Sequence, residues 1–233
     1  MTDLVSPKHR LSAPPRPMRL LVTGGTGVLG RALLPIARRA GHTVLAPRHA
    51  DLDLFDRDAV RRAVRGVDAV LHLATRIRGL DDLDQPDAWR ENDRLRADAS
   101  GILVDAAGAT TTSVYVQPSV TFVYPPGAPA DEETPIGEVS PILASALVAE
   151  RNALRFTGAG RRGVVLRLGL LDGPGTGHDD PVPAMGATVH VADAAAALLA
   201  ALELPAGIYN VCRDGERISN ARLSQAAGWR PRH

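Results

Sequence analysis

The chain is almost without lysine and cysteine. Among 233 residues, Lys8 is the only lysine and Cys212 the only cysteine, and arginine supplies the other basic side chains. A single cysteine excludes an internal disulfide and a cysteine-rich metal site, and we expect no metal. Because Lys8 lies in a proline-rich N-terminal stretch, we expect that no folded position supplies a catalytic ammonium group.

The sequence also lacks a strong net charge and a long apolar run. Its formal net charge of +1 argues against nucleic-acid and anionic-membrane partners. No apolar stretch reaches the length that spans a membrane. Residues 1–17 contain four prolines and no apolar core of the signal-peptide kind. We therefore expect a disordered tail over residues 1–17 and a cytoplasmic protein.

What is present is a regular alternation of short apolar runs with helical patterns. The alternation predicts an α/β fold with a doubly wound parallel sheet, the Rossmann architecture. We expect a single NAD(P)-binding domain over residues 18–233, with a reduced C-terminal substrate lobe from about 171–189 and 205–233. The expected strands are 18–23, 42–47, 67–74, 113–117, 163–170 and 208–212, and the expected helices are 28–40, 56–65, 88–107, 142–156, 190–204 and 219–227.

A glycine-rich turn stands between the first expected strand and the first expected helix. It reads TGGTGVLG from Thr23 to Gly30, with glycines at a spacing of three. This spacing lets the backbone turn tightly, approach a pyrophosphate and pack the helix against the strand. The helix N-terminus adds unpaired N–H groups. The turn predicts a dinucleotide site formed by Thr23, Gly24, Gly27, Val28, Leu29 and Gly30.

The end of the second expected strand indicates which dinucleotide is bound. An acidic residue there would bind the ribose hydroxyls of NAD, whereas an arginine would meet the 2′-phosphate of NADP. The sequence from Val44 to His49 contains no acid, and it places Arg48 at the strand end. We therefore expect NADP rather than NAD, with a solvated surface arginine as the alternative interpretation.

In these residues the chain resembles the extended and atypical short-chain dehydrogenase/reductase family, of the NAD-dependent epimerase/dehydratase type. The glycine turn matches the family's TGxxGxxG, and the segments DLFDRDAV, HLA, RLGLLDGPG, VHVADAA and YNV are similar to further family segments in the same order. The resemblance covers roughly residues 18–228. It implies a homodimer, and it implies further cofactor contacts along the adenine and ribose from Asp53, Leu54, Leu73, Ala74 and Asn92.

The resemblance fails at the catalytic residues. Redox members of the family use a serine or threonine and a Tyr-x-x-x-Lys pair, in which the ammonium lowers the pKa of the phenol. The matching positions here are Val120, Ile142 and Ala146, and all three are apolar. The other candidates for catalysis near the expected crevice are Tyr124, Ser119 and Asp172.

Three functions remain open from the sequence. The first is an NADP-binding enzyme that acts on a small substrate, such as a natural product, by an unusual redox step or by a lyase, isomerase or cyclase reaction. The second is a non-catalytic NADP-binding sensor or regulator. The third is a scaffold or partner subunit, which the intact Gly24, Gly27 and Gly30 argue against.

Overall fold

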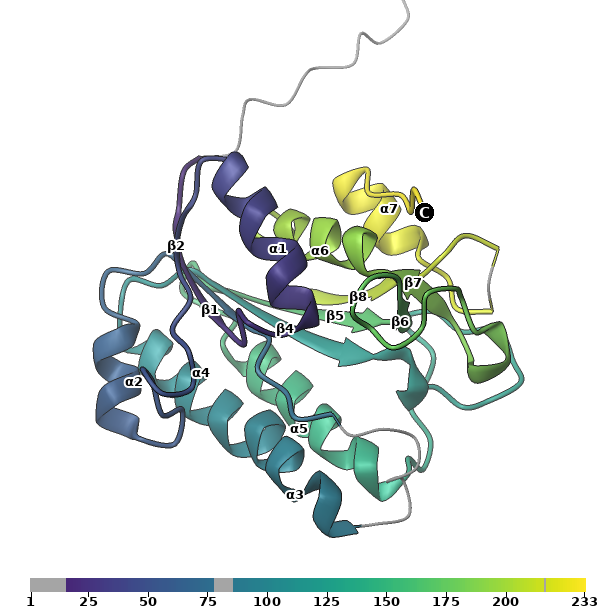
Figure 1. Cartoon of the computed structure of the whole chain (residues 1–233), viewed down its shortest axis with the longest axis horizontal. Coiled ribbons are helices and arrows are strands. Elements are labelled where there is room, and N and C mark those ends of the chain that lie inside the picture. Colours follow the sequence, from purple (N-terminus) through teal and green to yellow (C-terminus); the bar gives the residue numbers. More distant parts are fainter. Residues whose placement is uncertain (1–15, 78–85, 216) are drawn as a thin grey trace, which may run out of the picture.

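The fold is built on one six-stranded parallel sheet (Figure 1). The computed structural model describes residues 16–77, 86–215 and 217–233, so most of the expected tail lies outside the described residues. The strands lie in the order β2-β1-β3-β4-β5-β8, and every neighbouring pair is parallel. Their bounds are β1 (Arg19–Thr23), β2 (Thr43–Leu45), β3 (Ala69–His72), β4 (Val114–Val120), β5 (Arg162–Leu168) and β8 (Gly207–Val211).

Helices cover both faces of this sheet, as Figure 1 shows. One face carries α1 (Val28–Arg39), α6 (Val191–Ala200) and α7 (Ala221–Ala227). The opposite face carries α2 (Arg57–Ala63), α3 (Pro86–Arg94), α4 (Ser100–Gly108) and α5 (Pro141–Arg155). The predicted α/β fold with a doubly wound parallel sheet is confirmed. In the described part of the chain, no helix is long and apolar enough to cross a membrane.

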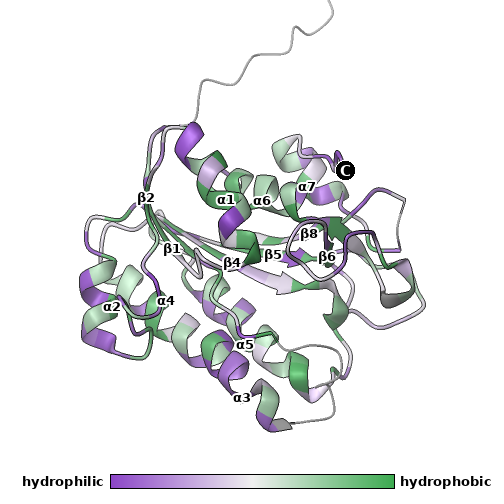
Figure 2. Cartoon of the chain, in the orientation of Figure 1, coloured by the Kyte–Doolittle hydropathy of each residue, from purple (hydrophilic) through white to green (hydrophobic). Residues whose placement is uncertain are grey.

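The alternation of side chains along the strands divides the core into two layers. In β1, Leu20 and Val22 belong to the cluster under α1 and α6, whereas Leu21 belongs to the cluster under α2, α4 and α5. All three are at most 1% exposed, because a central parallel strand is covered on both faces. The apolar strands and inward helix faces appear green in Figure 2.

Two expected elements are interrupted. The expected strand 163–170 ends at Leu168, and Gly169 then allows the Ala187 backbone to pass close by, since a β-carbon there would lie 2.7 Å from the Ala187 carbonyl oxygen. The chain then forms β6 (Leu170–Asp172), which pairs with β7 (Thr188–His190) in a separate two-stranded sheet. The expected helix 88–107 begins at Pro86 and contains a π turn at Leu95–Ala99.

The C-terminal part of the chain contributes to both sheets. β8 is an edge strand of the main sheet, although we expected residues 205–233 to belong to the substrate lobe. A third, small apolar cluster joins the segments that follow β4, β6 and β8. Its buried members are Tyr124, Ala130, Ala187, Cys212 and Ile218. The cluster lies beyond the carboxyl ends of β4 and β8.

Candidate nucleotide and substrate site

The glycine turn lies at the carboxyl end of β1, where the strand order reverses between β1 and β3. Gly24 has φ +70°, and a β-carbon there would lie 2.6 Å from backbone atoms of Leu73 and Ala74. A β-carbon at Gly30 would lie 2.5 Å from the Gly24 carbonyl oxygen. These two positions therefore require glycine if β1, β3 and α1 are to approach this closely.

The start of α1 suits an anion. The helix is capped by Gly27 with no side-chain hydrogen bond, and its first turn contains no acidic residue. Its first N–H groups are therefore free of side-chain acceptors, and the positive end of the helix dipole faces the same point. The residues of the turn thus fit the pyrophosphate of a dinucleotide, as the spacing predicts.

A buried histidine ties this turn to the π turn. Thr23 Oγ1 lies 2.7 Å from His72 Nδ1, and His72 Nε2 lies 3.0 Å from the Leu95 carbonyl oxygen. Because a carbonyl only accepts, Nε2 carries the proton and Nδ1 accepts from the threonine hydroxyl. Burial lowers the pKa of His72 to about 4. The imidazole is therefore neutral near pH 7, and it holds β1, β3 and the π turn in register.

His72 makes the stability of the fold depend on pH. The pKa of its imidazole is 6.5 when unperturbed and about 4 in the fold. The stability that the neutral imidazole contributes is therefore fully present above pH 6.5, and it is lost as the pH is lowered toward 4. The loss amounts to about 3 kcal/mol. We expect urea unfolding of the wild type to show this extra loss relative to His72→Gln between these pH values. Equal pH profiles for the two proteins would contradict it.

The residues expected along the adenine and ribose lie around the same end of the sheet. Asp53 accepts a hydrogen bond from the backbone N–H of Phe55 at 2.9 Å. Leu54 and Leu73 are buried, at 8% and 7% exposure. Asn92 is fully buried, and its Oδ1 accepts from the backbone N–H of Arg76 at 3.1 Å.

Arg48 follows β2 on the surface. Its side chain is 72% exposed and pairs with Asp51, at 3.1 Å between Nε and Oδ2. This pairing raises the pKa of Arg48 through the hydrogen bond, so the guanidinium stays charged. An exposed ion pair of this kind is weak, and the arginine can exchange its partner for a phosphate.

The 2′-phosphate prediction can be tested at Arg48 by binding alone. Replacing Arg48 by alanine is expected to weaken NADPH binding about 10- to 100-fold and to leave NADH binding unchanged, because only NADPH offers the phosphate. Fluorescence titration of both nucleotides measures the ratio. Arg39→Ala, which removes an exposed arginine at the end of α1, is the matched control. An unchanged ratio in Arg48→Ala would overturn the assignment.

Ser119 and Tyr124 end up in one buried network. The Ser119 hydroxyl donates to Glu150 at 2.6 Å, and Glu150 forms two hydrogen bonds with Arg167, at 2.9 and 2.7 Å. The Arg167 guanidinium lies over the Tyr124 ring at 4.8 Å. The Tyr124 hydroxyl donates to Asn210 at 2.9 Å, and burial raises its pKa. Both hydroxyls therefore already have acceptors within the protein.

Sequence reasoning missed Glu150 and Arg167 as partners. Their side chains are 5% and 4% exposed, and they join α5 to β5. Burial alone would lower the pKa of Arg167, but the hydrogen bonds and the charge of Glu150 outweigh that effect and raise it. An arginine inside the apolar run of β5 is the signal that could have revealed the pair, because a buried charge needs a partner.

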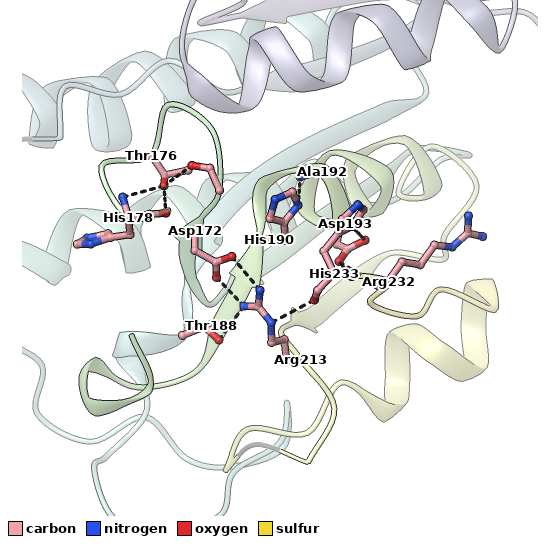
Figure 3. A network of polar contacts seen from close by, with 11 residues as sticks. Asp172, Thr176, His178, Thr188, His190, Ala192, Asp193, Arg213, Arg232 and His233 are labelled. Carbon is pink, nitrogen blue, oxygen red and sulfur yellow. Dashed lines mark hydrogen bonds and ion pairs between the residues drawn. The ribbon is translucent and has the colours of Figure 1, made fainter. Parts of the chain in front are cut away.

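Asp172 belongs to a different polar network, which Figure 3 shows. At the end of β6, its two carboxylate oxygens accept from Arg213, at 2.5 and 2.8 Å. Arg213 also donates to the Thr188 hydroxyl and to the carbonyl of His233. The acid is 2% exposed, and within the described residues it pairs with Arg213 rather than with Ser119 or Tyr124. The structure thus brings two of the three predicted catalytic residues together and places the third in the small lobe.

The three family positions without catalytic side chains lie at the ends of neighbouring elements. Val120 closes β4, and Ile142 stands in the first turn of α5. Ala146 lies one turn later and is 1% exposed. A lysine at this position would have to displace the side chains packed around it. Across the described ranges, no group of three or more His, Cys, Asp and Glu residues is placed to hold a metal ion.

Known proteins share this fold. The chain is 34% identical over 253 aligned positions to a 3-diazoavenalumate denitrifying reductase of a Streptomyces species, with 93% of this chain and 80% of the relative covered. The structure of MoeE5 in complex with UDP-glucuronic acid and NAD superimposes with a TM-score of 0.76 at 20% identity, covering 92% of this chain and 94% of the other.

A second solved structure carries the other nicotinamide cofactor. RMD from Pseudomonas aeruginosa complexed with NADPH superimposes with a TM-score of 0.76 at 24% identity, and it covers 92% of this chain and 94% of that one. These two neighbours contain NAD and NADPH, and the matching family model is described as NAD dependent, so a nicotinamide cofactor is supported. The model of the NAD dependent epimerase/dehydratase family matches residues 20–188. By this match and by its identity to the Streptomyces reductase, the chain belongs to the NAD dependent epimerase/dehydratase family.

Proposed function

We propose that this chain is an NADPH-dependent reductase that transfers a hydride to a small substrate bearing an aryl diazonium group. The observation that carries the proposal is an intact nucleotide turn combined with apolar residues at Val120, Ile142 and Ala146. These three side chains cannot give a proton to a product. The Streptomyces relative, a 3-diazoavenalumate denitrifying reductase, supports this substrate class.

A diazonium substrate needs no proton donor. Reduction of a carbonyl places charge on oxygen, which a positioned acid must then protonate. A diazonium group is positively charged at the start, so a hydride at its terminal nitrogen neutralises it. Reduced nicotinamide supplies that hydride, with both electrons. The C–N bond of the aryldiazene then breaks, dinitrogen leaves and the hydrogen ends on the ring carbon, so atoms and charge balance.

The residues of the chain then have positioning roles. Val120 and Ile142 are half-buried and would shield the reacting group from water. The Ser119 and Tyr124 hydroxyls donate to Glu150 and Asn210, so we assign them to holding the end of β4. The remaining rate enhancement would come from orientation, which suffices when the substrate is already reactive.

The proposal is tested with two substrate classes. We expect the protein to oxidise NADPH in the presence of a benzenediazonium salt, above the rate without enzyme, and to leave benzaldehyde unreduced. Tyr124→Phe should keep the diazonium rate within about threefold, because losing a true proton donor lowers a rate by about 100-fold or more. Loss of NADPH absorbance is the readout.

Other outcomes overturn the proposal in different ways. Aldehyde reduction that disappears in Tyr124→Phe would make Tyr124 an acid and the chain a carbonyl reductase. If the protein binds NADPH but neither substrate oxidises it, the alternative of a non-catalytic NADP-binding sensor would be favoured.

A further inference from the structure

The π turn carries an arginine whose charge has no close partner. Arg96 is 8% exposed, yet no carboxylate of the described residues lies within 4.0 Å of its guanidinium. Its hydrogen bond runs from Nη1 to the carbonyl of Ile142 at 3.5 Å, which is long. A guanidinium has several N–H donors. The other Arg96 donors make no hydrogen bond within the described residues and still reach the surface, so a ligand can approach them.

These donors lie next to the candidate site. Leu95, the preceding residue, accepts from His72, which itself bonds to Thr23 of the glycine turn. On its other side, Arg96 reaches Ile142, in the first turn of α5 at the family's tyrosine position. Arg96 thus stands between the nucleotide turn and the place where the substrate is expected.

The surroundings of Arg96 do not neutralise it. The opposing charge that acts on Arg96 is Asp93, whose carboxylate accepts from the Ser145 hydroxyl at 2.6 Å. Burial lowers the pKa of Arg96, and the attraction of Asp93 opposes this effect only in part. One turn earlier on the helix, Asn92 Nδ2 is buried and has no hydrogen-bond acceptor either. This helix face offers donors without acceptors, which is the arrangement that receives an anion.

We propose that Arg96 binds a carboxylate of the substrate and so anchors it. This proposal rests on the proposed reductase function. A carboxylate matches the planar fork of the guanidinium with two parallel hydrogen bonds. A phosphate dianion fits less well, because Arg96 stands beside the negative Asp93 and its contacts within the described residues include no second cation. The substrate class becomes a small aromatic acid that also bears the diazonium group.

The anchor can be tested without any reaction. Calorimetric titration of the NADP⁺-loaded protein with cinnamate, with its uncharged amide and with inorganic phosphate compares the ligands. We expect cinnamate to bind about 10- to 100-fold more tightly than the amide, and Arg96→Leu to remove that difference. Arg90→Leu, which removes an exposed arginine of α3, should keep it. If Arg96→Leu does not fold by its thermal transition, Arg96→Gln is used in the same titrations.

The outcomes separate the anchor from the reductase function. Equal binding of cinnamate and its amide by the wild type, tighter binding of phosphate, or a difference that survives in both Arg96 variants would overturn the anchor. If the cinnamate preference depends on Arg96 but no diazonium is reduced, the anchor stands and the proposed reaction falls.

Discussion

Replacing Gly27 by valine is expected to weaken NADPH binding about 100-fold or more while the fold persists. Gly27 has φ −73°, which any residue adopts, and a β-carbon there would meet only the Gly24 carbonyl oxygen, at 3.2 Å. The added methyl groups would therefore occupy the space in which the helix N-terminus meets the pyrophosphate. Fluorescence titration with NADPH measures the loss, and thermal unfolding shows that the variant folds.

The control for Gly27→Val is a substitution at a glycine that lies far from the nucleotide turn. Gly108 ends α4, and a β-carbon there would come no closer than 4.0 Å to a neighbour, the Nη1 atom of Arg161. Gly108→Ala should therefore bind NADPH like the wild type. If Gly27→Val bound NADPH with the wild-type affinity, the glycine turn would not be the pyrophosphate site.

The largest effect on stability is expected from Glu150→Gln. The substitution keeps the size of the side chain but leaves Arg167 as an uncompensated charge that is 4% exposed. Breaking a buried ion pair from one side lowers the free energy of unfolding by about 3–5 kcal/mol. Urea unfolding of the variant measures the loss, and Ser119 also loses its charged acceptor.

An exposed ion pair provides the control for this effect. Glu91 lies 3.5 Å from Arg76, and both side chains are more than half exposed. Glu91→Gln should change the free energy of unfolding by less than about 1 kcal/mol. A loss as small as this in Glu150→Gln would mean that the Arg167–Glu150 pair does not hold α5 against β5.

The parts of the fold that sequence reasoning predicted depend on local patterns. The apolar runs of β1 and β3 and the glycines between β1 and α1 determine conformation within a few residues. The order of the elements then limits the topology, because parallel strands need helical crossovers. The nucleotide turn could therefore be located from Thr23 to Gly30 without a structure.

The parts that escaped prediction depend on contacts between distant segments. The Ala187 backbone passes close to Gly169, and the Leu95 carbonyl of the π turn accepts from His72, 23 residues earlier in the chain. The partners of Ser119 and Tyr124, Glu150 and Asn210, are 31 and 86 residues away along the chain. No spacing rule relates such residues, so the sequence could not show that both hydroxyls already have acceptors within the protein.

The most direct measurement is the stoichiometry of the proposed reaction. Purified protein is mixed with NADPH and a benzenediazonium salt that also carries a carboxylate, and dinitrogen is counted by mass spectrometry against NADPH oxidised. The account predicts one dinitrogen released for each NADPH consumed, at a rate that Gly27→Val reduces to that of the enzyme-free mixture. Dinitrogen release that does not depend on the protein, or an equal rate in Gly27→Val, would contradict it.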